Sequence, residues 1–173
     1  MHLQTIMVQI ADWKWTLEAV HHACLLAHKT SAAIALIKMV PIRHAIWIGT
    51  PLGFPRLTEQ DRIDLYAYTT TMEHEGIRYS VVVFQYFTLA RAIAEAAHEV
   101  EAQVVFATLP HPPIPYWHRL QSWSLRRRLA HHQCLLVDQE WIAAHSGVSD
   151  KQKVSGQKRA GWIRIKNAEI SED

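Results

Sequence analysis

Five short apolar runs, each separated from the next by a segment with helical periodicity, are the feature that most constrains how this chain can fold. The runs lie at residues 3–11, 32–40, 79–86, 103–109 and 134–139. Near-continuous apolar runs of this length are typical of strands that are buried on both faces. The segments between them are long enough for helices and lie at about 13–29, 58–75, 88–100 and 117–131.

This alternation of strand and helix predicts a parallel sheet, because each helix must carry the chain back across the sheet before the next strand begins. We therefore expect an α/β fold: a doubly wound, mostly parallel five-stranded sheet with helices on both faces, Rossmann-like or flavodoxin-like. Residues 1–140 form the expected domain. Residues 141–173 are a basic C-terminal tail, whose order the sequence leaves open.

Local signals support the helices. Trp13, Leu17, Val20 and Cys24 recur at helical spacing and predict the buried face of the first helix. In the third helix the predicted apolar stripe consists of Leu89, Ile93, Ala96 and Val100. The second helix has a start signal in Thr58 and Asp61 and a stop signal in Gly76, and Thr88 is the predicted N-cap of the third.

Composition excludes several classes of protein. Apolar residues make up 49% of the chain, which excludes a disordered protein, and the formal net charge of +2 argues against an obligate nucleic-acid binder. Two cysteines are too few for a disulfide framework and favour a reducing compartment. The chain has no signal-peptide pattern and no apolar run near the ~20 residues of a membrane span. We expect a cytoplasmic protein.

Several local phrases resemble the universal stress protein family. Residues 6–10 and the helix near Trp13 resemble its opening strand and first helix, and 92–106 (AIAEAAHEVEAQVVF) resembles its third helix and fourth strand. The segment 129–137 (LAHHQCLLV) is similar to the family's closing segment, with His131 and Cys134 on matching residue types. The resemblance covers residues 3–139 and implies the fold described above.

The family's ATP-binding loop is where this chain departs from the resemblance. Nucleotide-binding members carry G-x2-G-x9-G followed by Ser or Thr after the fourth strand, whereas this chain has no glycine between Gly76 and Gly147. The matching loop, 108–124, contains four prolines, which remove N–H donors that phosphates would need. We expect the ATP site to be lost and no cofactor to be bound. Tyr116, Trp117 and Trp123 are expected to fill the resulting hollow rather than to stack on a ligand.

A second interpretation keeps the cleft as a divergent sensor for ATP, AMP or another anion. The family's acidic residue after the first strand has its nearest counterpart in Asp12, and Ser122 and Ser124 stand near the final Gly-Ser of the motif. Arg119 and Arg126 share a helix face, so their guanidinium groups could bind a phosphate. Basic residues in a last helical turn also complement the helix dipole, which favours a structural role for Arg126–Arg128.

Catalytic and metal-binding patterns are absent from the sequence. The pairs His21–His22 and His131–His132, and His111 with His118, lack the H-x3-H or C-x2-C spacing of zinc sites, so no metal is expected. There is no G-x-S-x-G elbow, P-loop or G-x-G-x-x-G. Cys134 is expected to be buried and unreactive. We therefore do not expect an enzyme.

The leading functional hypothesis is a regulatory or scaffold domain that acts through protein contacts, without ATP hydrolysis. We expect a homodimer that pairs through the last strand, because that strand lies at a sheet edge and has no proline or lysine to block pairing. Its interface residues would be Cys134, Leu135, Leu136 and Val137. The alternative is that residues 162–165 of the tail, which alternate in β fashion, cover this edge within one chain.

Overall fold

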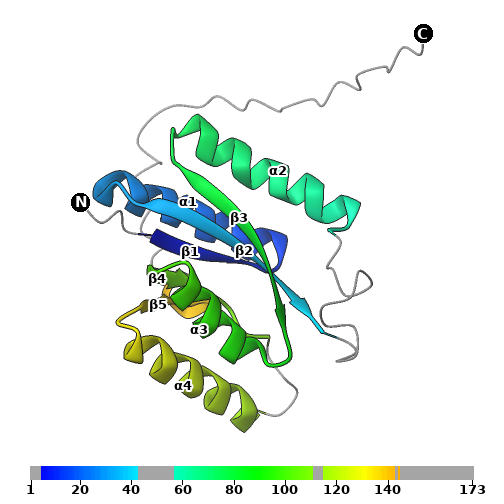
Figure 1. Ribbon diagram of the computed structural model, residues 1–173, viewed down its shortest axis with the longest axis vertical. Helices are drawn as coiled ribbons and strands as arrows, with labels where there is room; N and C mark the ends of the chain where they lie inside the picture. The colour runs from blue at the N-terminus through cyan, green and yellow to red at the C-terminus, as the bar shows by residue number, and fades with distance from the viewer. Residues whose placement is uncertain (1–4, 43–56, 111–114, 143, 145–173) are drawn as a thin grey trace.

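The computed structural model describes residues 5–42, 57–110, 115–142 and 144 (Figure 1). Its strands are β1 (Thr5–Ile10), β2 (Ala33–Pro41), β3 (Tyr79–Tyr86), β4 (Ala102–Phe106) and β5 (Leu135–Val137). Its helices are α1 (Trp13–Thr30), α2 (Glu59–His74), α3 (Leu89–Glu99) and α4 (Pro115–His131). Residues 43–56, residues 111–114 of the proline-containing loop and the predicted tail segment 162–165 lie outside the described residues.

The five strands form one sheet in the order β3-β2-β1-β4-β5, and every neighbouring pair is parallel. Figure 1 shows α1 and α2 on one face of this sheet and α3 and α4 on the other. The predicted doubly wound α/β fold is therefore confirmed. Strand order reverses between β1 and β4, and this is the topological switch point where ligands bind in open sheets of this class.

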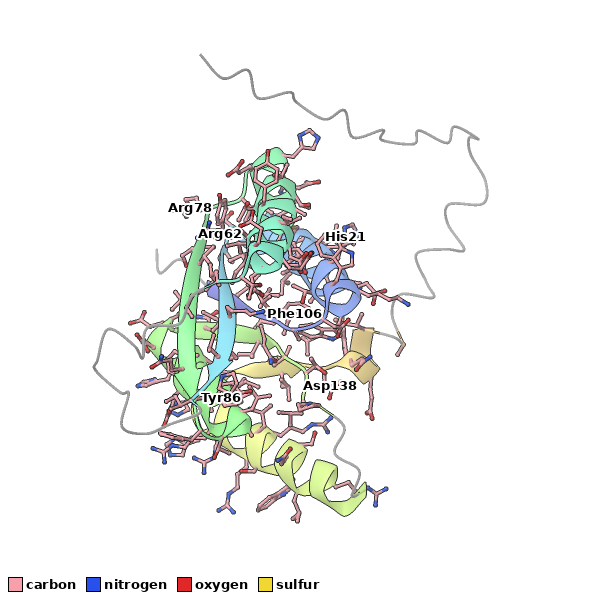
Figure 2. All side chains as sticks on the ribbon, turned by 90° about the vertical axis from the view of Figure 1, so that its right-hand side faces the viewer. His21, Arg62, Arg78, Tyr86, Phe106 and Asp138 are labelled. Carbon is pink, nitrogen blue, oxygen red and sulfur yellow. The ribbon has the colours of Figure 1, made fainter. Side chains whose placement is uncertain are left out.

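Successive side chains of β1 and β2 point to opposite faces of the sheet, so the protein has two hydrophobic cores, one on each face. Ile6 and Val8 point to the α1–α2 face, where they pack with Phe106 and the buried side of α1. Met7 and Ala35 point the other way, to the core beneath α3 and α4. Figure 2 labels Phe106 near the middle of the molecule, and its side chain is only 2% exposed.

The predicted buried face of α1 is wrong by about a quarter of a turn. Val20 and Cys24 are buried as expected, but Trp13 is 45% exposed and Leu17 is 39% exposed. The buried side of α1 runs instead through residues 15, 16, 19, 20, 23, 24 and 27. Trp13 stacks on Tyr68 of α2 at 5.2 Å between ring centroids, so it covers the outside of the α1–α2 contact. The predicted stripe of α3 is confirmed, since Ile93 and Ala96 are buried.

The last two strands are shorter than predicted, for local reasons. β4 ends at Phe106 instead of residue 109, and the N–H of Thr108 is bonded to a side chain of β1. β5 ends at Val137 because Asp138 starts a helical turn, in which its Oδ1 accepts from the N–H of Trp141 at 3.1 Å. The next residue, Ile142, is 1% exposed and joins the α1–α2 core, so the core extends past the expected domain end at 140.

Each helix is followed by a residue with positive φ within a few positions of its end. Gly76 has φ +66° after α2, in the predicted position. After α1, α3 and α4 the left-handed residues are Ser31, Glu101 and Gln133, with φ of 57°, 51° and 57°. A side chain in this conformation costs roughly 1 kcal/mol or more, so three helix ends are strained where glycine would relieve them.

Within the described residues, no helix is both long and apolar enough to span a membrane.

Candidate functional site

Two adjoining cavities lie at the carboxyl end of the sheet, beside the switch point. The first, which we call the switch-point cavity, has a volume of about 410 Å³. It is lined by Gln9, Ile10, Ala11, Asp12, Lys38, Met39, Tyr86, Leu89, Thr108, Leu109, Pro110 and Gln139. These residues end or follow all five strands, so the parallel sheet brings them together.

Gln9 joins the two strands that flank the switch point. Its side chain is 4% exposed, and its Oε1 accepts from the N–H of Thr108 at 2.9 Å. This bond ties the end of β1 to the chain that leaves β4. The backbone N–H of Thr108, at the start of the loop 108–124, is thus paired within the protein.

Asp12 has a structural role at the start of α1. It is the N-cap residue, and its Oδ1 accepts from the N–H of Trp15 at 3.0 Å. Thr16 fixes the same turn, because its hydroxyl donates to the carbonyl of Asp12 at 2.8 Å and accepts from the N–H of Ala11 at 3.0 Å. Asp12 still lines the switch-point cavity, as the sensor interpretation requires.

Lys38 supplies the cation of the switch-point cavity. Its Nζ lies 2.6 Å from Oδ1 of Asp61 on α2, and both side chains are mostly buried. The hydrogen bond from Lys38, together with those from Thr58, lowers the pKa of Asp61 from 3.8 to about 2. Asp61 is therefore ionised at neutral pH, and the Lys38 side chain that it binds lies at the cavity wall.

The second cavity, which we call the Arg126 cavity, has a volume of about 270 Å³ and lies between β4, β5 and α4. It shares Thr108, Leu109 and Gln139 with the switch-point cavity. Ser122 and Arg126, one turn apart on α4, line it. The guanidinium of Arg126 donates to Oδ2 of Asp138 at 2.6 Å, so an acidic group already neutralises this candidate anion-binding arginine.

The predicted ligand set is thus only partly brought together. Asp12 lies in one cavity, and Ser122 and Arg126 lie in the next. Ser124 lies instead in a groove between α3 and α4, and Arg119 is exposed on α4 without lining either cavity.

Trp123 is 59% exposed, with the guanidinium of Arg127 5.4 Å from its ring centroid, so the expectation that it fills the hollow is wrong. On a helix, Trp123 points away from its neighbours Ser122 and Leu125, which face the Arg126 cavity. The side chains of Tyr116 and Trp117 lie outside the described residues.

The thiols and imidazoles have the following surroundings. Burial raises the pKa of Cys24 to about 11. Cys134, expected to be buried, is only partly buried; this partial burial still raises its pKa, and its Sγ donates to the carbonyl of Ala102 at 2.9 Å. No group of three His, Cys, Asp or Glu side chains that could hold a metal occurs in the described part of the chain. The rings of His98 and His132 stack at 4.7 Å, a contact between α3 and the end of α4 that sequence spacing does not reveal.

Sequence reasoning did not single out Gln9, Lys38 and Thr108. A usable signal was present, because each is a polar residue near the carboxyl end of a predicted apolar strand. In a parallel sheet such ends meet at one edge, so polar residues there are expected to share a site.

Comparison with solved structures shows the same fold in universal stress proteins. One from Burkholderia pseudomallei is 16% identical with a TM-score of 0.52, and the match covers 78% of this chain and 94% of that one. One from Archaeoglobus fulgidus is 13% identical with a TM-score of 0.52, covering 78% of this chain and 92% of that one.

A universal stress protein solved in complex with cAMP is 17% identical with a TM-score of 0.52, covering 78% of this chain and 94% of that one. No protein-family model and no curated protein sequence matches the chain. The resemblance found in the sequence is confirmed as a shared fold.

Proposed function

We propose that this chain, which has the universal stress protein fold, is a regulatory or scaffold protein that acts through protein contacts and does not turn over ATP. The observation that carries the proposal is that the polar groups at the switch point are paired within the protein. Gln9 accepts a hydrogen bond from the N–H of Thr108, and Asp12 caps α1. Arg126 donates a hydrogen bond to Asp138. A phosphate would have to break these contacts before it could use the same groups.

The two thiols support the non-catalytic part of the proposal and its cytoplasmic setting. Cys24 and Cys134 are both unpaired, as expected in a reducing compartment. Because burial raises the pKa of each thiol, neither is a thiolate at neutral pH.

A second candidate function, a sensor of an adenine nucleotide or another anion, is favoured by Lys38. Its side chain, which is paired with Asp61, lines a cavity of about 410 Å³ together with Tyr86 and Thr108. A nucleotide is the kind of ligand that open α/β sheets bind at this place. A universal stress protein with the same fold was solved in complex with cAMP, which supports testing adenine nucleotides as ligands.

Thermal unfolding in the presence of ATP, AMP or cAMP separates the two functions. A ligand at 100 times its Kd would stabilise the protein by roughly 2.7 kcal/mol. The scaffold proposal expects no shift with any of the three at millimolar concentration. A shift that is lost in Lys38→Met but kept in Lys29→Met, an exposed lysine at the end of α1, would establish the sensor instead.

We also propose that the protein is a homodimer paired through β5. This strand is at the edge of the sheet, and Leu135 within it is 63% exposed. Its one neighbour in the described sheet is β4, which pairs with only one side of the β5 backbone. Pairing of two β5 edges about a twofold axis would satisfy the remaining N–H and C=O groups and cover Leu135.

The opposite edge, β3, is the rival interface, since it is eight residues long and Val81 is 37% exposed. Light scattering after size exclusion distinguishes the two edges. Leu135→Lys is expected to give a monomer, whereas Val81→Lys and the control Ile63→Lys, an exposed position on α2, leave the dimer intact. A monomeric unmodified protein at micromolar concentration would refute dimerisation, and a dimer sensitive only to Val81→Lys would move it to β3.

A further inference from the structure

A groove between α3 and α4 lies apart from the two cavities of the candidate site. Its volume is about 610 Å³, and it is open along the outer surface of the two helices. Figure 1 shows α3 and α4 side by side on the same face of the sheet. Of the residues that line the other cavities, none lines this α3–α4 groove, so it is a separate feature.

The α3–α4 groove carries positive charge that the described residues do not neutralise. Arg127 and Arg128 of α4 both line it, and both are exposed. The one acidic residue among its lining residues is Glu95, and its carboxylate is held by Arg91 at 2.6 Å. Among the described residues, no carboxylate lies within ion-pair distance of Arg127 or Arg128.

The same groove presents flat aromatic rings. Trp123 is 59% exposed, and the guanidinium of Arg127 lies over its ring. At the other end His98 and His132 stack at 4.7 Å, and His131 meets His132 edge-on at 5.3 Å. A tryptophan left this open contributes little to the core, so packing alone does not account for it.

We propose that the α3–α4 groove binds single-stranded nucleic acid without sequence preference. The guanidinium groups of Arg127 and Arg128 pair with successive phosphates, and bases stack on Trp123 and on the imidazole rings. Cations interleaved with exposed aromatic rings are the features that single-strand binding requires, because every base has a face that can stack. An acidic peptide would use the arginines and leave the rings without a role. A duplex is disfavoured because its bases are stacked inside and do not reach such rings.

Binding of a fluorescein-labelled 12-nucleotide single-stranded RNA of mixed sequence to the full-length chain, followed by anisotropy from 50 to 200 mM salt, tests the proposal. Each phosphate contact on a single strand contributes about −0.7 to the slope of log K against log salt. Two arginines therefore predict a slope of about −1.4. The double variant Arg127→Gln/Arg128→Gln is expected to bring the slope close to zero and to weaken binding about tenfold or more at 50 mM salt.

Trp123→Leu separates stacking from charge. Loss of one stacked base costs roughly 1–3 kcal/mol, which is about 5-fold to 150-fold in affinity, while the salt slope stays unchanged. The matched control for charge is Arg62→Gln/Arg78→Gln, which removes the same two charges at the end of the molecule opposite α4 (Figure 2). This control is expected to bind as the unmodified chain does. Circular dichroism and melting temperature verify that each variant is folded.

Three outcomes would overturn the proposal. Absence of binding at 50 mM salt refutes it directly. Equal losses in the groove and control double variants would show that only net charge or the basic tail attracts the RNA. Unchanged affinity of Trp123→Leu, with inorganic polyphosphate competing as well as RNA does, would show a general polyanion site in which the rings take no part.

Discussion

Replacing Asp61 by Asn is expected to lower the free energy of unfolding by about 2 kcal/mol at pH 7. Asp61 accepts from Nζ of Lys38 at 2.6 Å and from the N–H of Thr58 at 3.0 Å, so one carboxylate joins α2 to β2 and closes the capping box of α2. These contacts lower its pKa from 3.8 to about 2. The side chain is 22% exposed, so solvent screening is modest, and the difference in pKa corresponds to about 2 kcal/mol.

The pH dependence of this loss has a definite sign. Because the pKa of Asp61 is lower in the folded protein, its contribution is present above pH 3.8 and is lost as the pH falls toward 2. The difference in free energy of unfolding between the unmodified protein and Asp61→Asn, which we call the stability gap, should therefore stay near 2 kcal/mol from pH 7 to pH 5. It should narrow to about 1 kcal/mol at pH 3.

Urea unfolding followed by far-ultraviolet circular dichroism at pH 7, 5 and 3 measures the gap. Asp64→Asn is the matched control, since Asp64 lies on the same helix and its carboxylate accepts only from the side chain of Gln60, at 2.6 Å, among the hydrogen bonds described. Its cost should be below about 1 kcal/mol. A gap for Asp61→Asn below about 0.5 kcal/mol at pH 7, or one that does not narrow at pH 3, would refute the assigned role of the pair.

Three further changes test the rest of the structure by urea unfolding. Gln9→Leu should cost about 1–3 kcal/mol, because the N–H of Thr108 loses its partner, and a neutral result would mean that this N–H has another acceptor. Glu101→Gly should stabilise the protein by about 0.5–1 kcal/mol through relief of its φ of 51°, so destabilisation would contradict the left-handed turn. Phe106→Ala should cost about 3–5 kcal/mol, since the ring is 2% exposed at the centre of the α1–α2 core, and a cost below about 1 kcal/mol would place it outside that core.

The sequence determined the class of fold and the order of the elements. Apolar runs separated by helical segments permit few arrangements, because parallel strands need crossovers and crossovers are right-handed. The same local rules placed the Thr58–Asp61 capping box and the Gly76 turn correctly. Such features depend on residues close together in the chain, so the sequence alone contains the information that specifies them.

Tertiary packing decided the features that join distant residues. The surroundings of Trp13 depend on where α2 lies, because Tyr68 of α2 stacks on its ring, and the periodicity within α1 does not reveal this contact. The hydrogen bond from the N–H of Thr108 to Gln9 spans 99 positions, and the pair of Lys38 and Asp61 joins a strand to a helix. A site at the carboxyl end of a parallel sheet is assembled from strand ends that only the sheet order makes neighbours. The hydrogen bonds and ion pairs of this site therefore depend on the folded structure and not on local sequence.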